Sequence, residues 1–569
     1  MSVATRPDPR ERSRAHARAP LGRLRPGGVG LALAGLLLAA LALRLWSIDH
    51  GLPYVYNPDE ELHFVPRAVA MFGGSFNPGY FENPPSLTYL LHAVFRVRFL
   101  AGFPFGGTGF GRAFLDDPTA AYLTARVTVA LIGTAVVGLV FWAGRRFADA
   151  RAGLVAAALM AFAFLPVFYS KQALNDVVTL APVAVALVAS LLALERGRTV
   201  HWLLAGAAVG AATATKYTAG AMLVVVGLAA LGRWRRGAGL RDSALGLVFA
   251  GVAFGVVFFA LNPFSLADPR EFASQVRGQS ATAGGSSKLG QDDVPGWLYY
   301  LWTLGWGFGV LPALAALGGA VIALRRDAWR GLLLVAFPVL LFLFLGGQAR
   351  FFGRWLMPVY PALAILAGVA VAWAADRLPA ASARRRAAVA GALAALLAAQ
   401  GLVSSVRVSS TLGRADTRTL AHDWIVAHVP PGSRIAVEPF VPQGFLTTGG
   451  RRAPERYERF PVKRPFQGYT RRLSPALIDR YRTEGYCWVV TASHQRGRGL
   501  KARLPGAVAY YSALDRGSTR IAAFSPFGAS AEPVPFSFDL SFNYQPRAYE
   551  RPGPVVEVHR LRACRPRVT

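Results

Sequence analysis

The stretch SALGLVFAGVAFGVVFFALN, residues 243–262, decides the fold class of this chain. It carries no charged side chain, and as a helix it is long enough to cross a hydrocarbon layer of about 30 Å. Ten further segments are strongly apolar candidates for spans, so the sequence predicts a polytopic α-helical membrane protein with about eleven transmembrane helices. The ten lie at 30–43, 121–143, 152–169, 176–194, 201–214, 218–232, 303–324, 331–347, 355–375 and 387–406.

The composition excludes several other classes of protein. The 569 residues are 53% hydrophobic and 16% charged, which is too apolar for a disordered chain. Two cysteines are too few for a fold built on disulfides. A net charge of +31 would suit nucleic acid, but the basic residues form short clusters between apolar runs instead of one patch. We therefore expect the lipid bilayer as a partner and no nucleic acid.

The basic clusters predict how the chain is oriented in the membrane, because short cytoplasmic loops carry an excess of Lys and Arg. With the basic tail 1–28 in the cytoplasm, every predicted inner loop is basic, and the odd number of spans places residues 407–569 outside. A signal peptide is the alternative for the N-terminus, but Arg44 and Trp46 stand where its small-residue cleavage site would lie. The expected location is the cell membrane. The inner clusters are Arg145–Arg151, Glu195–Arg198, Arg233–Arg241, Arg325–Arg330 and Arg377–Arg386.

Residues 201–232 are the least clear part of this topology. Lys216 interrupts an apolar stretch that could be one long span or two short ones. A single span would invert all later loops and place the clusters at Arg325 and Arg384 outside, against the charge rule. Two spans are therefore expected.

The chain divides into three predicted parts. The tail 1–28 is followed by a transmembrane domain, 29–406, with long outer loops at 49–118 and 263–300. The second loop holds a Gly/Ser stretch at 284–287, which suits a mobile loop over a substrate, and the pair Asp292-Asp293, which is more typical of a solvated turn.

Residues 407–569 are predicted to form a soluble extracytoplasmic α/β domain, because long apolar runs cease and helix and strand patterns alternate. Cys487 and Cys564 would both lie outside the cytoplasm and could form a disulfide between neighbouring strands. The expected helices are 416–428 and 475–482, and the expected strands are 434–437, 487–490 and 555–561.

The first outer loop carries the most chemistry. Asp59, Glu60 and Glu61 are three consecutive carboxylates at a membrane surface, and His63 follows one turn later. Asp59 follows a proline and could cap a helix, where the helix dipole stabilises acids. A carboxylate beside the bilayer could equally serve as a general base or a metal ligand. The two interpretations are compatible.

Four stretches in this order resemble the GT-C superfamily of membrane glycosyltransferases, in particular the bacterial branch similar to protein O-mannosyltransferases and lipid A aminoarabinose transferases. They are Asn57-Pro58-Asp59-Glu60, Asn83-Pro84-Pro85, Thr215–Thr218 and Arg354–Pro361. The resemblance covers about residues 30–406. The stretch from Asp416 to Ile435 is also similar to the extracytoplasmic domain of many bacterial members.

The resemblance implies an inverting glycosyltransferase that moves a sugar from a polyprenyl-phosphate donor to an acceptor hydroxyl on the extracytoplasmic face. In the family an acidic pair opens the first outer loop, and its leading Asp acts on the acceptor. The catalytic pair here would be Asp59 and Glu60, although Glu61 is an alternative second acid because the spacing to His63-Phe64 departs from the family pattern. A base is needed because the pKa of a sugar hydroxyl lies far above neutrality.

The leaving group of such a reaction is a lipid phosphate, so cations should meet its growing negative charge. Lys216, Arg350 and Arg354 each stand at a predicted outer end of a span. The two arginines could instead extend to the interface as membrane anchors. Lys171 and Arg67 are weaker candidates. Other expected substrate-binding residues are Glu61, His63 and Tyr56, whose ring could stack on a sugar.

The sequence leaves the acceptor open between a glycan, a lipid and a protein, and the sugar between a hexose and a pentose. No cofactor is certain, and a divalent metal is compatible with the acidic loops although no ligand spacing demands one. The rival interpretation is a transporter or flippase for a lipid-linked or polar substrate. Transporters place ionisable residues near the bilayer midplane, whereas the acids here cluster in an outer loop.

Overall fold

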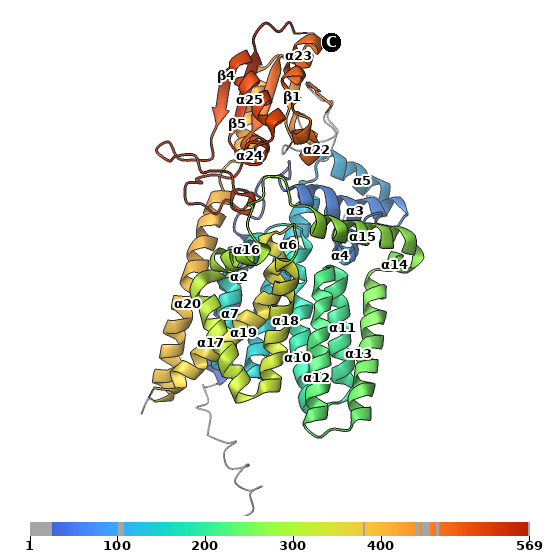
Figure 1. Cartoon of the computed structure of the whole chain (residues 1–569), viewed down its shortest axis with the longest axis vertical. Coiled ribbons are helices and arrows are strands. Elements are labelled where there is room, and N and C mark those ends of the chain that lie inside the picture. Colours follow the sequence, from blue (N-terminus) through green and yellow to red (C-terminus); the bar gives the residue numbers. More distant parts are fainter. Residues whose placement is uncertain are drawn as a thin grey trace, which may run out of the picture.

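The computed structural model describes residues 26–100, 107–378, 382–439, 443–446, 456–461 and 466–566. A bundle of long helices carries a smaller domain with a central sheet at one of its ends (Figure 1). Most of the predicted tail 1–28 falls outside the described residues.

Nine helical segments within these described ranges are long and apolar enough to cross a membrane. They confirm the predicted class of a polytopic α-helical membrane protein. They are formed by α2 (Pro26–Leu45), α6 (Thr119–Phe147), α9 and α10 (Asn175–Val178, Leu180–Arg196), η3 and α12 (Tyr217–Met222, Leu223–Arg235), α13 (Leu240–Leu261), α16, η4 and α17 (Gly296–Leu304, Gly305–Gly309, Val310–Arg326), α18 (Ala328–Gly346), η5 and α19 (Gly353–Val359, Tyr360–Asp376) and α20 (Ala383–Leu412).

The two remaining predicted spans correspond to shorter helices in the same bundle. Residues 152–169 form α7 (Ala150–Phe162) and α8 (Phe164–Tyr169), and residues 201–214 lie in α11 (Thr199–Thr215). Helix α11 runs against α13 in backbone contact, because a Cβ at Gly206 would come within 1.9 Å of the Ala250 carbonyl oxygen. The bundle thus contains nine helical segments of spanning length and two shorter ones among the described residues.

Lys216 divides the ambiguous stretch 201–232 into two helices. Its backbone is extended, which ends α11 and starts η3. The two-helix interpretation of this stretch is therefore confirmed.

The predicted inner loops meet at the end of the bundle away from the soluble domain. Glu195 pairs with Arg146 at 3.0 Å and with Arg330 at 2.9 Å, and Arg236 pairs with Asp327 at 2.5 Å. These loops come from four different places in the sequence, so their contact shows that the basic clusters share one end.

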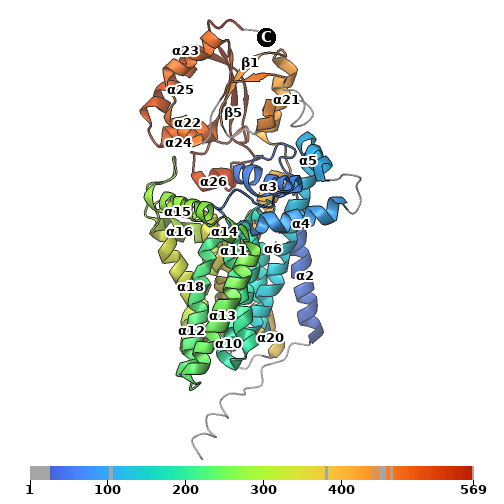
Figure 2. The ribbon, with the colours of Figure 1, turned by 90° about the vertical axis from the view of Figure 1, so that its right-hand side faces the viewer.

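Short helices cover the opposite end of the bundle and separate it from the soluble domain (Figure 2). The first outer loop forms η1 (Glu60–Phe64), α3 (Val65–Ala70), η2 (Met71–Gly73), α4 (Ser86–Leu100) and α5 (Gly107–Asp116). The second forms α14 (Phe264–Ala267) and α15 (Pro269–Gly285). Because α15 includes Gly284 and Gly285, half of the predicted Gly/Ser loop is helical.

The soluble domain is built on a five-stranded sheet of order β2-β1-β3-β5-β4. Strands β1, β2 and β3 are parallel, whereas β5 pairs antiparallel with both β3 and β4. The strands are β1 (Arg434–Val437), β2 (Glu458–Arg459), β3 (Trp488–Ala492), β4 (Ser518–Phe524) and β5 (Val556–Leu561). The helices are α21 (Thr417–His428), α22 (Phe466–Arg471), α23 (Pro475–Glu484), α24 (Ser493–Lys501), α25 (Pro505–Gly517) and α26 (Phe538–Phe542), and η6 (Gln443–Leu446) is a short turn.

Helices cover both faces of this sheet. Successive side chains of a strand point to opposite faces, so Ile435 packs with α21 while the neighbouring Ala436 packs with α23 and α25. Cys487 and Cys564 form a disulfide beside β3 and β5, as expected for cysteines on neighbouring strands. The predicted α/β architecture is thus confirmed, and the two cysteines, whose pairing the sequence left open, form a disulfide.

Candidate functional site

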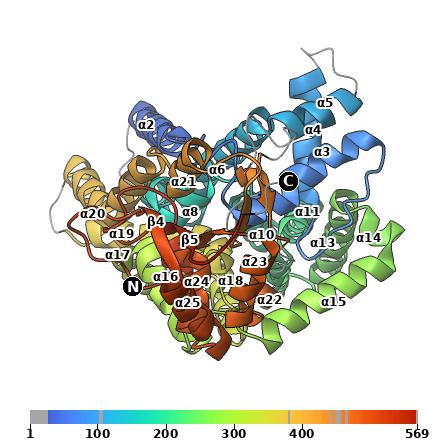
Figure 3. The same cartoon turned by 90° about the horizontal axis from the view of Figure 1, so that it is seen from above.

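A cavity of about 710 Å³ lies between the outer end of the bundle and the soluble domain. The bundle side is lined by the first outer loop, by the residues after α8 and by the segment before α19, and includes Asp59, Gln172 and Arg354. The soluble domain contributes residues of α21, α24 and α26, among them Arg418 and Arg498. Seen from above, the C-terminal domain overlies the bundle (Figure 3).

Asp59 stands at the start of η1 but does not cap it. The Asn57 side chain does so: its Oδ1 accepts the backbone N–H groups of Asp59 at 2.9 Å and of Glu60 at 3.2 Å. The Asp59 side chain makes no cap hydrogen bond and is 41% exposed to the cavity. The capping interpretation of Asp59 is therefore wrong, and its carboxylate is directed to other partners.

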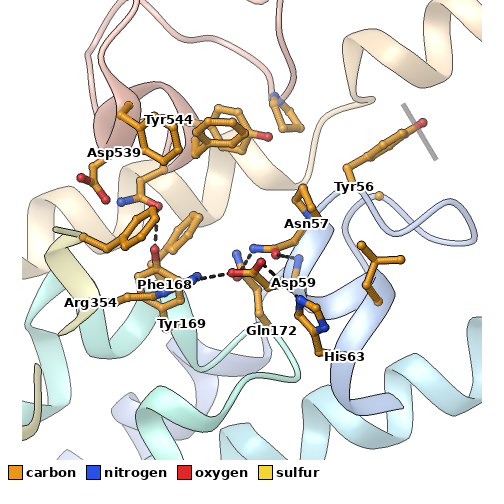
Figure 4. Close-up of a pocket in the computed structure, with 18 of the residues that line it drawn as sticks. Tyr56, Asn57, Asp59, His63, Phe168, Tyr169, Gln172, Arg354, Asp539 and Tyr544 are labelled. Carbon is orange, nitrogen blue, oxygen red and sulfur yellow. Dashed lines mark hydrogen bonds and ion pairs between the residues drawn. The ribbon is translucent and has the colours of Figure 1, made fainter. Parts of the chain in front are cut away.

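The Asp59 carboxylate forms an ion pair with the Arg354 guanidinium (Figure 4). Arg354 Nε also lies 3.8 Å from Oδ2 of Asp176, and Asp176 in turn pairs with Lys216. The order Asp59, Arg354, Asp176, Lys216 alternates in charge. Asp176 is 3% exposed and Lys216 is 9% exposed, so the inner half of this row is shielded from water.

The neighbouring cations also decide the protonation state of Asp59. Its burial alone would raise the pKa of the carboxyl group, but Arg354, followed by His63 and Lys288, favours the charged form more strongly. The pKa of Asp59 consequently lies below its ordinary value. Asp59 is thus ionised at neutral pH.

Glu60 is fully buried and is not part of the cavity wall, although its partner Arg126 is. Its two oxygens each accept a hydrogen bond of 2.8 Å from the Arg126 guanidinium, and Oε1 also accepts the Ala173 N–H at 2.9 Å. This geometry ties the first outer loop to α6 and to the turn before α9. Glu60 therefore positions the loop, and it does not present a carboxylate to the cavity as the predicted catalytic pair would require.

Glu61 is also buried, and its side chain is not part of the cavity wall. Its carbonyl oxygen accepts the hydroxyl of Tyr122 at 3.3 Å. Of the three consecutive carboxylates, Asp59 alone lines the cavity. The second acid that the sequence left open between Glu60 and Glu61 is not found in this cavity wall.

His63 and Tyr56 both line the cavity on either side of Asp59. Nε2 of His63 lies 3.9 Å from Oδ1 of Asp59, and its ring stacks on Tyr80 with centroids 4.5 Å apart. The Tyr56 hydroxyl forms a hydrogen bond of 2.7 Å with Thr419, and the Arg418 guanidinium covers its ring at 3.9 Å. Tyr56 is thus held by α21 of the soluble domain.

Three further cations line the wall near Arg354. Arg350 donates to the Ser286 hydroxyl at 3.4 Å, and Arg498 donates to the carbonyl of Leu289 at 3.0 Å. The Lys288 ammonium lies 5.8 Å from the centre of the Phe352 ring. Burial, together with Arg498, Arg350 and Arg354, lowers the pKa of Lys288 to about 8 although Asp59 opposes this. This side of the cavity therefore carries an excess of positive charge that suits an anion.

The weaker candidates have structural partners. Lys171 donates to the carbonyls of Leu43 at 2.6 Å and of Trp46 at 2.5 Å, which satisfies the end of α2. Arg67 donates to the Pro78 carbonyl at 2.6 Å. Asp292 pairs with Lys501 of α24, so this acid joins the second outer loop to the soluble domain instead of forming a solvated turn.

The sequence analysis missed several residues of the site, among them Asp176, Lys288 and Asp539. Asp176 could have been found, because a carboxylate at the outer start of an apolar span is costly unless it is paired. Lys288 is the single lysine of the loop 263–300, which is a weak signal. Asp539 follows no pattern that would bring it to the membrane domain, and the structure places it in the cavity wall.

A metal site does not emerge from the same residues. Within the described ranges, no group of three or more His, Cys, Asp or Glu side chains is arranged to hold a metal ion.

Residues 118–261 match the profile of a family described as dolichyl-phosphate-mannose-protein mannosyltransferase. This segment covers α6 to α13 and includes Asp176 and Lys216, but not Asp59 or Arg354. No curated protein sequence matched the chain.

Solved structures match over almost the whole chain. The crystal structure of apo ArnT from Cupriavidus metallidurans has a TM-score of 0.53 and 17% identity, and covers 94% of this chain and 98% of that one. The structure of the same protein bound to undecaprenyl phosphate has a TM-score of 0.51 and 18% identity, with 96% and 100% covered. The apo oligosaccharyltransferase from Archaeoglobus fulgidus has a TM-score of 0.54 and 14% identity, with 90% and 75% covered. At these identities the likeness is one of fold, and with the family match it supports a membrane glycosyltransferase of the GT-C superfamily.

Proposed function

We propose that this chain is an inverting glycosyltransferase that moves a sugar from a polyprenyl-phosphate donor to an acceptor hydroxyl on the extracytoplasmic face of the membrane. The observation that carries the proposal is the ion pair of Asp59 and Arg354 at the wall of a cavity between the bundle and the soluble domain. The proposed general base and the proposed phosphate ligand are thus in contact at the end of the bundle. Residues 118–261 match a family whose description names a lipid-phosphate sugar donor, and this match supports the proposed reaction.

Asp59 is the proposed base. It takes the proton of the acceptor hydroxyl while the acceptor oxygen forms a bond to the anomeric carbon of the sugar. The bond from that carbon to the phosphate oxygen breaks in the same displacement, and the electron pair leaves with the polyprenyl phosphate. A single displacement inverts the anomeric configuration. A positioned base of this kind contributes about 10²–10⁴-fold to the rate.

Arg354 is the proposed ligand of the phosphate, with Lys288 and Arg350 beside it. These cations stabilise the negative charge that grows on the leaving group. Because Arg354 also holds Asp59, a bound phosphate competes for the same guanidinium. Donor binding would thus loosen Arg354 from Asp59 and raise the basicity of the carboxylate at the stage when the acceptor hydroxyl has to lose its proton.

Lys216 acts in this proposal through Asp176. Its ammonium is bound to that carboxylate and it is not part of the cavity wall. It therefore neutralises Asp176 and leaves Arg354 available for Asp59 and the phosphate.

The proposed location is the cell membrane, with the N-terminus in the cytoplasm and the soluble domain outside. The basic loops gather at the end opposite to the soluble domain, in line with the positive-inside rule. The disulfide of the soluble domain suits an oxidising compartment. The charged residues converge at the outer end of the bundle, which favours transfer over transport, because transporters hold such residues near the midplane.

The proposal is tested with purified protein in lipid, a panel of polyprenyl-phosphate sugars and acceptors from the glycan, lipid and protein classes. We expect wild-type protein to release polyprenyl phosphate and form a glycoside of inverted configuration with one donor. Asp59→Asn should abolish transfer while the protein inserts and purifies normally. Undiminished turnover of this variant would remove Asp59 as the base.

A further inference from the structure

Helix α26 of the soluble domain reaches down to the outer end of the bundle. Its Asp539 side chain is buried between two elements of the membrane domain. One carboxylate oxygen accepts the hydroxyl of Tyr299 from α16, and the other accepts the backbone N–H of Gly353 at 3.3 Å. Asp539 also lines the cavity, on the side where Arg354 stands (Figure 4).

Gly353 directly precedes Arg354 in η5. The hydrogen bond from the Gly353 amide therefore fixes the backbone from which the Arg354 side chain extends toward Asp59. Few positions in the chain could act on that guanidinium more directly without touching it.

The rings that flank Arg354 are contacted by the same segment of the soluble domain. The Arg354 guanidinium carbon lies 5.5 Å from the centre of the Phe352 ring and 5.7 Å from that of Tyr169. The Phe538 ring packs edge-on against Phe352 with centroids 5.5 Å apart. Beyond α26, the Asn543 amide oxygen accepts the Tyr169 hydroxyl at 3.3 Å. Residues 538–543 thus touch the backbone and both aromatic surfaces beside Arg354.

We propose that Asp539 is a positioning residue for Arg354, by which the soluble domain sets the place of the phosphate-binding guanidinium. This inference rests on the proposed function, because it takes Arg354 to be the ligand of the donor phosphate. Asp539 itself does not touch the reacting atoms. It acts by holding the Gly353 amide.

Burial of a carboxylate costs free energy, so this group would be unfavourable if its role were only to hold the two domains together. Burial raises the pKa of Asp539 to about 6, although Tyr299, Gly353 and Arg354 each act in the opposite direction. Phe538 of the same helix already supplies apolar contact with Phe352 of the membrane domain. A buried acid is retained at low cost only where donors satisfy it. One of the two donors to Asp539, the Gly353 amide, belongs to the segment that carries Arg354, and the other is the Tyr299 hydroxyl of α16.

The test measures the affinity of the purified full-length chain in lipid nanodiscs for undecaprenyl phosphate. Asp539→Ala should bind this lipid about tenfold more weakly than wild type, because the Gly353 amide is left without its acceptor. Asp539→Asn should restore most of the affinity, because its amide oxygen can still accept from Gly353 and its amide nitrogen can donate to Tyr299. Asp515→Asn is the matched control, since Asp515 is an exposed acid of the same domain paired with Arg496, and it should bind as wild type does.

The double variant Arg354→Ala, Asp539→Ala shows whether Asp539 acts through Arg354. A positioning role predicts that the double variant binds no more weakly than Arg354→Ala alone. Additive losses in the double variant, or full affinity in Asp539→Ala, would overturn the positioning role. If Arg354→Ala binds as tightly as wild type, the proposed phosphate ligand is wrong and the positioning role is lost with it. Additive losses, or full affinity in Asp539→Ala, would leave the proposed function standing. Full affinity in Arg354→Ala would not, so the two failures are distinguishable.

Hydrogen exchange of the peptide that contains Gly353 gives a second readout that is independent of lipid binding. The exchange should be faster in Asp539→Ala and close to wild type in Asp539→Asn. Should Asp539→Ala fail to fold, Tyr299→Phe replaces it, because it removes one hydrogen bond to Asp539 and keeps the ring packed against Phe351. About threefold weaker lipid binding by this variant would support the role. Unchanged exchange together with unchanged binding would refute it.

Discussion

The Asp59 carboxylate and the Arg354 guanidinium form an ion pair across the cavity wall although 295 residues separate them in the sequence. One belongs to the first outer loop and the other to the start of the helix η5–α19. Both side chains are more accessible than Glu60 and Asp176, which are buried. A donor phosphate that enters the cavity therefore meets a cation whose present partner is the proposed base.

Arg354→Lys should lower the affinity for a polyprenyl-phosphate donor by about tenfold, because an ammonium lacks the fork of N–H groups that lets one side chain serve Asp59, Asp176 and a phosphate. The measurement is the KM for the donor in a transfer assay in lipid. Arg277→Lys is the control, because Arg277 is exposed on α15 and hydrogen-bonds the Ala273 carbonyl of its own helix. Equal donor KM values in the two variants would count against Arg354 as the phosphate ligand.

Lys216→Ala should weaken donor use more than acceptor use, because an unpaired Asp176 draws Arg354 away from the cavity. The KM for the donor should rise about tenfold, while the KM for the acceptor changes little. Adding Asp176→Asn should recover part of the loss, since removing both partners of a buried pair costs less than removing one. If the double variant is worse than Lys216→Ala, Lys216 has a role other than neutralising Asp176.

Glu60→Ala should destabilise the protein by about 3–5 kcal/mol, because it leaves the buried Arg126 guanidinium without its carboxylate. The apparent unfolding temperature in detergent reports this loss. Glu195→Ala removes a partly exposed acid of the inner loops and should cost about 0–1 kcal/mol. Glu60→Ala protein that unfolds at the wild-type temperature but is inactive would instead return Glu60 to the chemistry.

The affinity for the donor should fall as the pH rises through about 8. The pKa of Lys288 is lowered to about 8 by burial and by Arg498, Arg350 and Arg354, while Asp59 opposes the shift, so its ammonium loses a proton in this range and the cavity loses positive charge. Lys288→Arg keeps its charge to much higher pH, so its donor KM should stay constant from pH 7 to about 9. A rise in KM of the same size in both proteins would show that another group titrates.

The residues that could be predicted from the sequence are those whose role depends on local pattern. Asp59 and Arg354 stand in recognisable stretches at predicted outer ends of spans, and the structure brings them together. Lys216 was expected at the phosphate, but its contact with Asp176 depends on a partner 40 residues earlier in the chain. Arg126, 66 residues away, likewise determines that Glu60 is the one of the three consecutive acids that is buried in an ion pair.

The fold, too, could be predicted only where local patterns in the sequence determine it. Apolar length predicts the helices of the bundle, and alternation predicts β1, β3 and β5 within a residue or two. What no local pattern contains is the docking of the soluble domain, because it depends on single contacts such as Asp539 with Gly353 and Arg418 with Tyr56. The cavity is formed by that docking. The part of its wall that the C-terminal domain supplies could therefore not be predicted from the sequence.

The sheet order has a consequence for the time at which the enzyme becomes active during its synthesis. Strand β5, residues 556–561, lies between β3 and β4, both of which precede it in the sequence. The ribosome must therefore release β5 before the sheet can close and α26 can be held in place. By then the helices of the bundle, with Asp59 and Arg354 at one end, have been inserted into the bilayer, since domains form in order from the N-terminus. On the proposed function, the nascent chain carries Asp59 and Arg354 through most of translation without an assembled site, and we expect transfer activity to begin only after β5 has been translated.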